Sequence, residues 1–393
     1  MAVGRRSPPR TWIGWAVSET GTPVRPLDTR LDQLCTPALV VDVDRLERNI
    51  ATMAKRYADK GISLRPHVKT SKCWDVARRQ LSAGAIGFTC STPAEVAWLH
   101  EKGVTDLLWA HQPVGPRKVE FVVSIAASGT LTVALDSLEA AEPLARAAVA
   151  TGVTVPFALE VNTGHARAGV EPENAAVRAR QIAMLPGLRL RGVLTHEGQL
   201  GGYAGDRAAL EQAGRSAGGL LVSVATTLRQ AGFEIEVVSV GSTPGATSAP
   251  FVDGVTEARP GTYVYYDANQ VRLGSATVQD CALTVLASVV SRQRPGRAII
   301  DAGIKAMSSD AIATAGSLGI ACTPNGTPLA DVVFSEGNEE HGYLTGPGAD
   351  TLRVGDLVRI VPNHACGATN MWSAIYAARG CRVMERWPIS ARH

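Results

Sequence analysis

"ISLRPHVKTSKCWDVARRQL" occupies residues 62–81 and changes character at its middle. Its first half is short and extended in pattern, whereas its second half has the apolar spacing of an amphipathic helix. Lys69 lies at the junction between the two halves. The stretch therefore predicts one β-strand followed by one α-helix, with a lysine placed where the strand ends.

The same strand-then-helix unit recurs up to about Gly245. Many of the predicted helices end in a glycine, which is the residue that most readily adopts the left-handed conformation at a helix C-terminus. The chain has eight strand-like runs, and a helical pattern clearly follows seven of them. The runs are residues 37–43, 62–70, 85–92, 106–112, 131–137, 155–162, 188–198 and 235–245.

Apolar strands that alternate with helices are typical of a parallel sheet covered on both faces. Eight units favour an α/β fold of the (β/α)8 TIM-barrel type over the alternative, a doubly wound open sheet. After about Asp267 the sequence becomes rich in β pattern and lacks long helices. We therefore predict an N-terminal arm (1–35) that partly joins the β-domain, a barrel (36–275) and a C-terminal, mostly β domain (276–393).

Composition excludes several classes of partner. The chain has 393 residues, of which 45% are hydrophobic, and its formal net charge is only +3. This charge favours neither nucleic acid nor an anionic membrane as a partner. The apolar runs are shorter than a membrane span, and "WIGWAV" in the arm is too short for a signal-peptide core. Seven scattered cysteines without a CxxC pair predict reduced thiols, and we expect a cytoplasmic protein.

Lys69 is a candidate nucleophile because functional groups of such barrels gather at the C-terminal ends of the strands. A lysine there can lose its proton and form a Schiff base with an aldehyde. The turn Gly241-Ser242-Thr243 follows another strand and offers backbone N–H groups and hydroxyls to a phosphate. Together they predict pyridoxal 5'-phosphate. The simpler alternatives are a solvated lysine and an ordinary turn.

Several motifs closely resemble the D-serine dehydratase / D-threonine aldolase family of fold type III (alanine-racemase-like) pyridoxal-phosphate enzymes. The resemblance runs from about Thr36 to Asn370. It is carried by "TPALVVDVDRLERNI", "LRPHVKTSK", "GHARAGV", "THEG", "GSTPGAT", "RPGTYVYYD", "DAGIKAMSSD", "EEHGYL" and "VPNHAC".

This resemblance implies a barrel, a β-domain and a homodimer with shared active sites. It also implies that Lys69 is the catalytic lysine that carries the cofactor and that Arg167 meets the phenolic oxygen of the cofactor. By the same resemblance, Gly241, Ser242 and Thr243 hold the phosphate, and Tyr266 lies near them. Departures from the family pattern at Ser71, at Ala168 and at His165 leave the substrate open.

The family also carries a divalent metal, which the resemblance places on His364 and Cys366. In a strand, residues i and i+2 face the same side, so imidazole and thiolate can reach one ion and leave positions open for substrate. Zinc suits a cysteine-containing pair best, with Mn²⁺ or Mg²⁺ as alternatives. The competing interpretation is a small core cysteine beside a loop histidine.

Other polar residues have two open interpretations each. His196 and Tyr203 are candidate cofactor-pocket residues or satisfied loop residues. Lys305 is a second active-site lysine or the partner of Asp301 or Asp310. The turn 339–341 (Glu-Glu-His) supports the metal or is only a charged turn.

The expected function is a pyridoxal-phosphate- and metal-dependent lyase acting on a small D-3-hydroxy amino acid. The cysteine and the "HEG" loop favour a dehydratase (D-serine or D-threo-3-hydroxyaspartate type) that yields a keto acid and ammonia. The main alternative is a D-threonine-aldolase-type cleavage to glycine and an aldehyde. A racemase would need a second base such as Tyr343 or Tyr376. A non-catalytic cofactor carrier would not need the β-domain.

Overall fold

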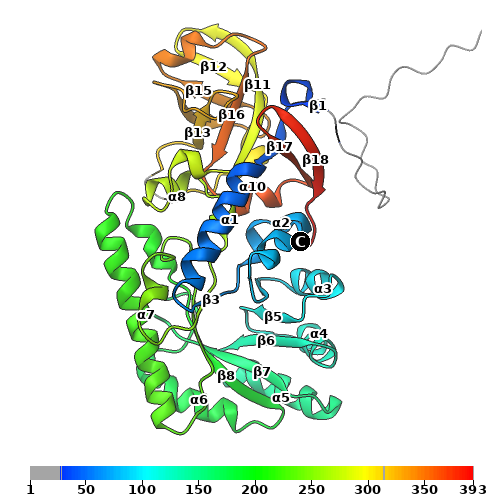
Figure 1. Ribbon diagram of the computed structural model, residues 1–393, viewed down its shortest axis with the longest axis vertical. Helices are drawn as coiled ribbons and strands as arrows, with labels where there is room; N and C mark the ends of the chain where they lie inside the picture. The colour runs from blue at the N-terminus through cyan, green and yellow to red at the C-terminus, as the bar shows by residue number, and fades with distance from the viewer. Residues whose placement is uncertain (1–26, 28, 313–314, 393) are drawn as a thin grey trace, which may run out of the picture.

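The structure is a computed structural model that describes residue 27 and residues 29–312 and 315–392. Two sheets organise it. A parallel, barrel-like sheet with surrounding helices occupies the lower part of Figure 1, and a β-rich part lies above it. The prediction of an alanine-racemase-like α/β fold, with a barrel and a mostly β domain, is confirmed.

The barrel sheet has eight strands, and every pair of neighbours is parallel. A parallel bridge between His67 and Thr89 joins the backbone beyond the first strand to the last one, so the sheet curls back on itself. In spatial order the strands are β3 (Ser63–Leu64), β10 (Glu257–Ala258), β9 (Val237–Val240), β8 (Leu188–Leu194), β7 (Val155–Glu160), β6 (Thr130–Leu135), β5 (Asp106–Trp109) and β4 (Phe88–Cys90).

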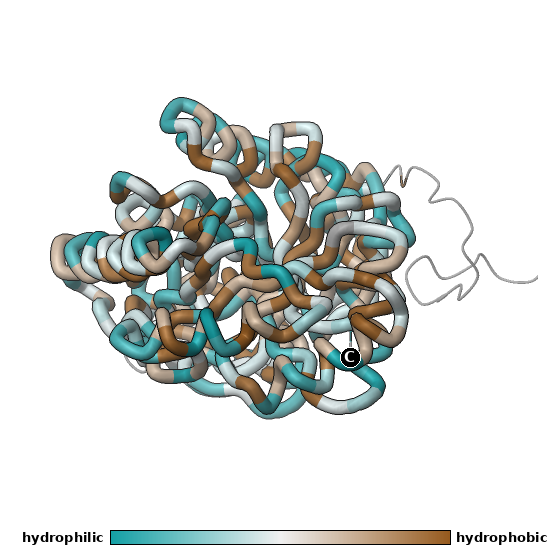
Figure 2. Tube along the Cα trace, turned by 90° about the horizontal axis from the view of Figure 1, so that it is seen from below, coloured by the Kyte–Doolittle hydropathy of each residue, from teal (hydrophilic) through white to brown (hydrophobic). Residues whose placement is uncertain are grey.

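Amphipathic helices cover the outside of this sheet. In the first one, Leu46, Ile50, Met53 and Tyr57 recur every three or four residues and are buried, while the side chain of Asp42 caps the helix N-terminus. Hydrophobic and hydrophilic segments alternate along the peripheral helices in Figure 2. The helices are α1 (Val43–Ala58), α2 (Trp74–Ser82), α3 (Pro93–Glu101), α4 (Pro116–Ala126), α5 (Leu138–Thr151), α6 (Ala175–Ala183) and α7 (Arg207–Gln230).

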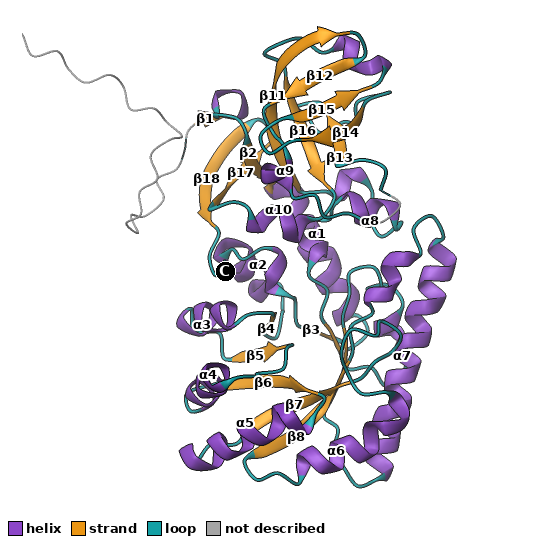
Figure 3. Cartoon of the chain, turned by 180° about the vertical axis from the view of Figure 1, so that it is seen from behind, coloured by secondary structure: helices purple, strands orange, loops and turns teal. Residues whose placement is uncertain are grey.

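The β-rich part is built on one ten-stranded sheet (Figure 3). Its main path runs β1 (Thr29–Arg30), β18 (Arg382–Pro388), β17 (Ala374–Arg379), β2 (Ala38–Asp42), β11 (Leu283–Arg294), β12 (Arg297–Ile300), β15 (Gly342–Thr345) and β14 (Val333–Gly337). Strand β16 (Leu357–Pro362) pairs with β11 and with β13 (Gly319–Cys322). Three short helices, α8 (Ala268–Arg272), α9 (Ile304–Met307) and α10 (Ala365–Asn370), complete this part.

Two strands differ from the sequence-based expectation. The run expected to be the first barrel strand, β2, lies instead in the β-rich sheet, antiparallel to β11 and parallel to β17. Strand β2 is buried on both faces, as a barrel strand would be, and hydrophobicity therefore does not tell which sheet it joins. The eighth barrel strand is β10, whose two residues are too few to give an apolar run. The domain boundaries stay a prediction.

The arm meets the β-rich part as expected, because β1 pairs with β18. Residues 1–26, which include the rest of the arm, lie outside the described residues. All seven cysteines are free thiols. Among the described residues, no helix has the length and hydrophobicity that crossing a bilayer requires.

Candidate active site

A cavity of about 770 Å³ opens where the loops at the C-terminal ends of the barrel strands meet the β-rich part. A volume of this size suits a cofactor together with a small substrate. Eight of the ten predicted site residues line it, and they come from segments that are far apart in the sequence. These eight are Lys69, Arg167, His196, Gly241, Ser242, Thr243, His364 and Cys366.

Lys69 sits on a single 3-10 turn, η2 (Val68–Thr70), which begins a few residues after β3. It lines the cavity, whereas Lys72, three residues later, does not. The Lys72 ammonium is buried and lies 2.5 Å from the Glu95 carboxylate. Of these two neighbouring lysines, only Lys69 is therefore placed to meet a ligand in the cavity.

The loop after β9 forms a compact cradle at the cavity wall. A Cβ atom on Gly241 would meet the Arg259 guanidinium at 2.9 Å, and one on Gly245 would meet the Ser242 hydroxyl at 2.9 Å. The Thr243 hydroxyl is buried and has no hydrogen-bond partner within the described structure. An unpaired buried hydroxyl beside glycines that admit close approach is what a phosphate group would satisfy. The residues present thus fit the phosphate of the expected cofactor.

His196 connects the end of β8 to this cradle. Its Nδ1 lies 2.5 Å from the Gly241 carbonyl oxygen, so Nδ1 carries the proton and Nε2 is left as an acceptor. Burial, with Lys69 nearby, lowers the pKa of His196 to about 3. The neighbouring Glu197 is also buried; it accepts a hydrogen bond from the Gly241 amide, and burial raises its pKa. His196 is therefore a neutral cavity residue.

Arg259 and His67 are among the cavity residues that were not predicted as site residues. Arg259 is buried and donates to the Ser239 hydroxyl and to the Thr195 carbonyl oxygen, which holds a cation against the cradle. His67 pairs through Nε2 with the Ser91 hydroxyl, and burial keeps its pKa well below the usual range. Arg259 lies in the motif "RPGTYVYYD", and His67 lies in the motif "LRPHVKTSK". No local pattern indicates that their side chains turn into the cavity.

His364 and Cys366 face the same cavity, although not from a strand. The expectation of a β segment is wrong: His364 is the N-cap of α10, and Cys366 is the second residue of that helix. The turn from β16 into α10 nevertheless brings the two side chains together. The nearby Cys366 raises the pKa of His364, and His364 lowers the pKa of Cys366 although burial opposes that.

The donor set fits a metal with open positions. The Asp310 carboxylate hydrogen-bonds to His364 Nδ1, and this contact leaves Nε2 for an ion. Across the described ranges, no three His, Cys, Asp or Glu side chains gather closely enough to form a complete metal site by themselves. A bound metal would displace the proton that the raised pKa of His364 favours, so that a neutral imidazole and a thiolate would be the protein ligands, with the remaining positions open to water or substrate.

The three remaining predicted site residues are Arg167, Tyr203 and Tyr266. Arg167 lines the cavity and lies 3.7 Å from the Glu160 carboxylate, with about half of its side chain exposed. Tyr203 packs in an apolar cluster with Leu200 and Leu210, and Tyr266 packs against the hydrophobic core. Neither tyrosine lines the cavity, and each is partly buried against apolar neighbours instead.

Lys305 and the turn 339–341, for which two interpretations were open, lie at the surface of the β-rich part. Lys305 pairs with Glu340 at 3.0 Å in an exposed ion pair, not with Asp301 or Asp310. Neither Lys305 nor the turn 339–341 lines the cavity, and the same holds for Tyr343 and Tyr376.

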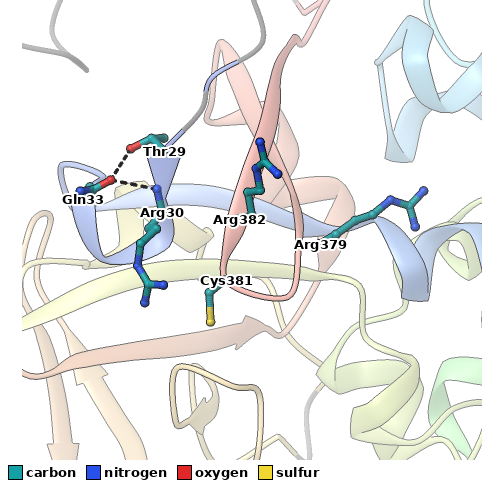
Figure 4. A pocket seen from close by; sticks show the side chains of 6 residues that line it. All are labelled: Thr29, Arg30, Gln33, Arg379, Cys381 and Arg382. Carbon is teal, nitrogen blue, oxygen red and sulfur yellow. Dashed lines mark hydrogen bonds between the residues drawn. The ribbon is translucent and has the colours of Figure 1, made fainter.

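A second cavity, of about 450 Å³, lies at the edge formed by β1 and β18 (Figure 4). Three arginines and Cys381 line it. Arg30 pairs with Asp32, and Arg379 pairs with Asp44. No predicted site residue belongs to this cavity.

Two family models match this chain. Residues 41–269 match the family model "Alanine racemase, N-terminal domain", and residues 282–378 match "Putative serine dehydratase domain". D-threo-3-hydroxyaspartate dehydratase of Delftia sp. (strain HT23) is 37% identical over 90% of this chain and 97% of its own length. D-threonine aldolase of Arthrobacter sp. is 30% identical over 94% and 96%.

Solved structures of related enzymes also resemble this chain. A cysteine-to-alanine mutant of D-threo-3-hydroxyaspartate dehydratase in the metal-free form superimposes with a TM-score of 0.86 at 35% identity, covering 92% of this chain and 98% of that one. A histidine-to-alanine mutant of the same enzyme gives a TM-score of 0.87, and the mutated histidine precedes the mutated cysteine by two residues.

The fold and the cavity define an alanine-racemase-like barrel enzyme. With a family model that matches more than half of the chain, the protein belongs to the alanine racemase N-terminal domain family, in the branch that also carries the serine dehydratase domain. The predicted class, a pyridoxal-phosphate-dependent lyase, is confirmed.

Proposed function

We propose that this lyase is a metal-assisted dehydratase of D-3-hydroxy amino acids, with D-threo-3-hydroxyaspartate or D-serine as substrate. The products would be a 2-oxo acid and ammonia. The single observation that carries the proposal is that Lys69 and the pair His364 and Cys366 line one cavity although they lie almost 300 residues apart.

The residues divide the work by position. Lys69 would remove the α-proton of the substrate, because an uncharged lysine amine can accept a proton and then donate it. The loop Gly241–Thr243 would hold the cofactor phosphate, and Arg167 the other end of the ring. Pyridoxal phosphate, when bound, supplies the electron-withdrawing system that makes the α-proton removable. His196 keeps the cradle in place through Gly241.

His364 and Cys366 would hold the divalent metal. A metal there supplies Lewis acidity that assists departure of the substrate β-hydroxyl. The spacing of the pair equals that of the mutated histidine and cysteine in the related dehydratase, one of whose structures is described as metal-free. Zinc is the metal that we propose, because a thiolate is a soft ligand.

The choice of dehydratase over aldolase rests on the ligand pair and on the comparisons. The chain is 37% identical to a D-threo-3-hydroxyaspartate dehydratase and 30% identical to a D-threonine aldolase. The sulfur of Cys366 lies beside the turn that carries Lys69. A base and a metal site so close together suit loss of an α-proton and a β-hydroxyl from one substrate.

Product analysis tests the proposal. Purified enzyme loaded with pyridoxal phosphate and Zn²⁺ would be incubated with D-threo-3-hydroxyaspartate, D-serine and D-threonine. A 2-oxo acid and ammonia in equal amounts support a dehydratase. Glycine with an aldehyde or glyoxylate instead would show an aldolase, and an L-amino acid would show a racemase.

A further inference from the structure

Lys72 occupies an unusual position directly after the turn that carries Lys69. Its φ angle is +45°, a left-handed conformation that a side chain other than that of glycine adopts only when its surroundings impose it. Only 4% of the residue is exposed. Lys72 is not a cavity residue, so contact with a ligand does not explain this conformation.

The Lys72 ammonium is held by two partners. It lies 2.5 Å from Glu95 Oε1 and donates to the carbonyl oxygen of Ala391 at 2.8 Å. Glu95 has no exposed surface, and its other oxygen accepts a hydrogen bond from the Ser91 amide at 2.6 Å. The Ser91 hydroxyl contacts His67 in the cavity. A chain of polar contacts thus runs from segment 389–391 through Lys72 and Glu95 to the cavity wall.

Segment 389–391 belongs to the β-rich part, because it directly follows β18. The Ile389 amide donates to the Ser373 carbonyl oxygen of that part, and the Ser390 amide donates to the Lys72 carbonyl oxygen at 2.7 Å. The side chain and the backbone of Lys72 are therefore both attached to the segment.

We propose that Lys72 is a positioning residue, which clamps the turn carrying Lys69 to the β-rich part and so sets the position of Lys69 relative to His364 and Cys366. The proposal rests on the proposed catalytic role of Lys69. Reactions between oriented groups lose rate steeply when one group is misplaced by about 1 Å, with losses of roughly a hundredfold. A clamp beside the reactive lysine gives a physical reason for keeping a charged, strained residue in a buried position.

A merely structural ion pair would affect stability alone. The distinguishing measurements are therefore kcat, KM and the visible circular dichroism of the lysine-bound cofactor, which reports its orientation. The test variant is Lys72→Met with Glu95→Gln, in which both charges are removed together and no lone charge stays buried. Met keeps the length of the side chain, and Gln keeps an acceptor for the Ser91 amide.

The matched control is Arg45→Met. Arg45 is also a largely buried cation between the barrel and the β-rich part, since it pairs with Asp42 and donates to the carbonyl oxygens of Val278 and Cys281. None of these described polar partners of Arg45 belongs to the turn that carries Lys69. The two variants are compared as holoenzymes with Zn²⁺, at temperatures the same number of degrees below their melting points.

We expect kcat of the Lys72/Glu95 variant to fall roughly ten- to hundredfold, with KM little changed and weaker circular dichroism per unit absorbance. Arg45→Met should retain kcat and the dichroism. Unchanged kcat and dichroism in the folded Lys72/Glu95 variant would overturn the proposal, as would an equal loss in the control. If the double variant does not fold, Ser390→Pro removes one hydrogen bond to Lys72, and the same two readouts decide.

Reduction of the wild-type holoenzyme with borohydride, followed by peptide mass analysis, separates this proposal from the proposed function. A cofactor adduct on Lys69 upholds the catalytic assignment, and the clamp is then judged by its variants alone. An adduct on another lysine overturns both.

Discussion

The hydroxyl oxygen of Thr70 lies 3.1 Å from the sulfur of Cys366, across 296 positions of sequence. This contact joins the turn that carries Lys69 to the helix that carries the proposed metal pair. Thr70 belongs to the barrel and Cys366 to the β-rich part, so the contact exists only when these two parts are assembled. It supports the proposed function, because the proposed base and the proposed metal site would then face one substrate.

Substitution of Lys69 should separate cofactor attachment from folding. Lys69→Ala is expected to lose the visible absorption band of the lysine-bound cofactor and all turnover, because no other described lysine lines the cavity. Lys305→Ala, which removes only an exposed ion pair, is the control and should keep both. Absorption spectra and product assays check this. A full band in Lys69→Ala would refute the assignment.

Removal of the metal should stop the chemistry and leave the cofactor bound. Dialysis against a chelator is expected to abolish turnover of 3-hydroxy substrates, because hydroxide departure then lacks Lewis-acid help, while the visible band stays. Added Zn²⁺ should restore the rate. Cys366→Ala should lose most activity, and Cys366→Asp should regain part of it with Mn²⁺, since a carboxylate suits a harder ion. Full turnover by protein shown to be metal-free by elemental analysis would contradict the prediction.

The buried hydroxyl of Thr243 should contribute to cofactor affinity. Thr243→Val removes one hydrogen bond to the phosphate and should raise the Kd of pyridoxal phosphate roughly tenfold, equivalent to about 1.4 kcal/mol. Gly241→Ala should be more damaging, because its Cβ would lie 2.9 Å from the Arg259 guanidinium. Thr226→Val, on the exposed face of α7, is the matched control. Spectroscopic titration of the cofactor-free protein measures all three.

The buried, neutral His196 should make the cofactor-free protein sensitive to acid. Its pKa is lowered to about 3 in the folded state from 6.5, so between these pH values the unfolded chain binds more protons. Stability should therefore fall as the pH drops below 6.5, and His196 should account for about 2 kcal/mol of that loss at pH 5.

Urea unfolding at pH 6.5 and at pH 5 tests this contribution. His196→Asn keeps a donor for the Gly241 carbonyl oxygen but does not titrate, so it should narrow the difference in unfolding free energy between the two pH values. Thr226→Val, which changes an exposed residue that does not titrate, should leave the difference unchanged. An identical difference in wild type and His196→Asn would show that His196 is not the group responsible.

The assembly state is a further prediction. We expect an isologous homodimer in which each chain contributes to its partner's site, as the family resemblance implies. Sedimentation equilibrium of the holoenzyme should give about twice the chain mass of 41.3 kDa. A fully active monomer would refute the shared site.

Local sequence pattern determined much of this fold. Seven of the eight predicted strand runs are barrel strands, and the helices between them have the expected buried faces, because hydrophobic periodicity directly reports which side chains leave water. The same pattern placed Lys69 at a strand end. Glycine-rich and hydroxyl-bearing residues likewise predicted the loop Gly241–Thr243.

Tertiary structure alone decided what such patterns do not encode, namely which element each surface meets. The sequence pattern of β2 predicts a barrel strand, because a strand buried on both faces has the same pattern in either sheet. In the structure, β2 pairs with β11 and β17 instead. Arg259 turns into the cavity and Tyr266 into the core, and residue type does not distinguish these directions. The contact between Thr70 and Cys366 joins residues that are even farther apart in the sequence. Local periodicity contains no information about residues 296 positions apart, and only the packing of the two parts brings those atoms together.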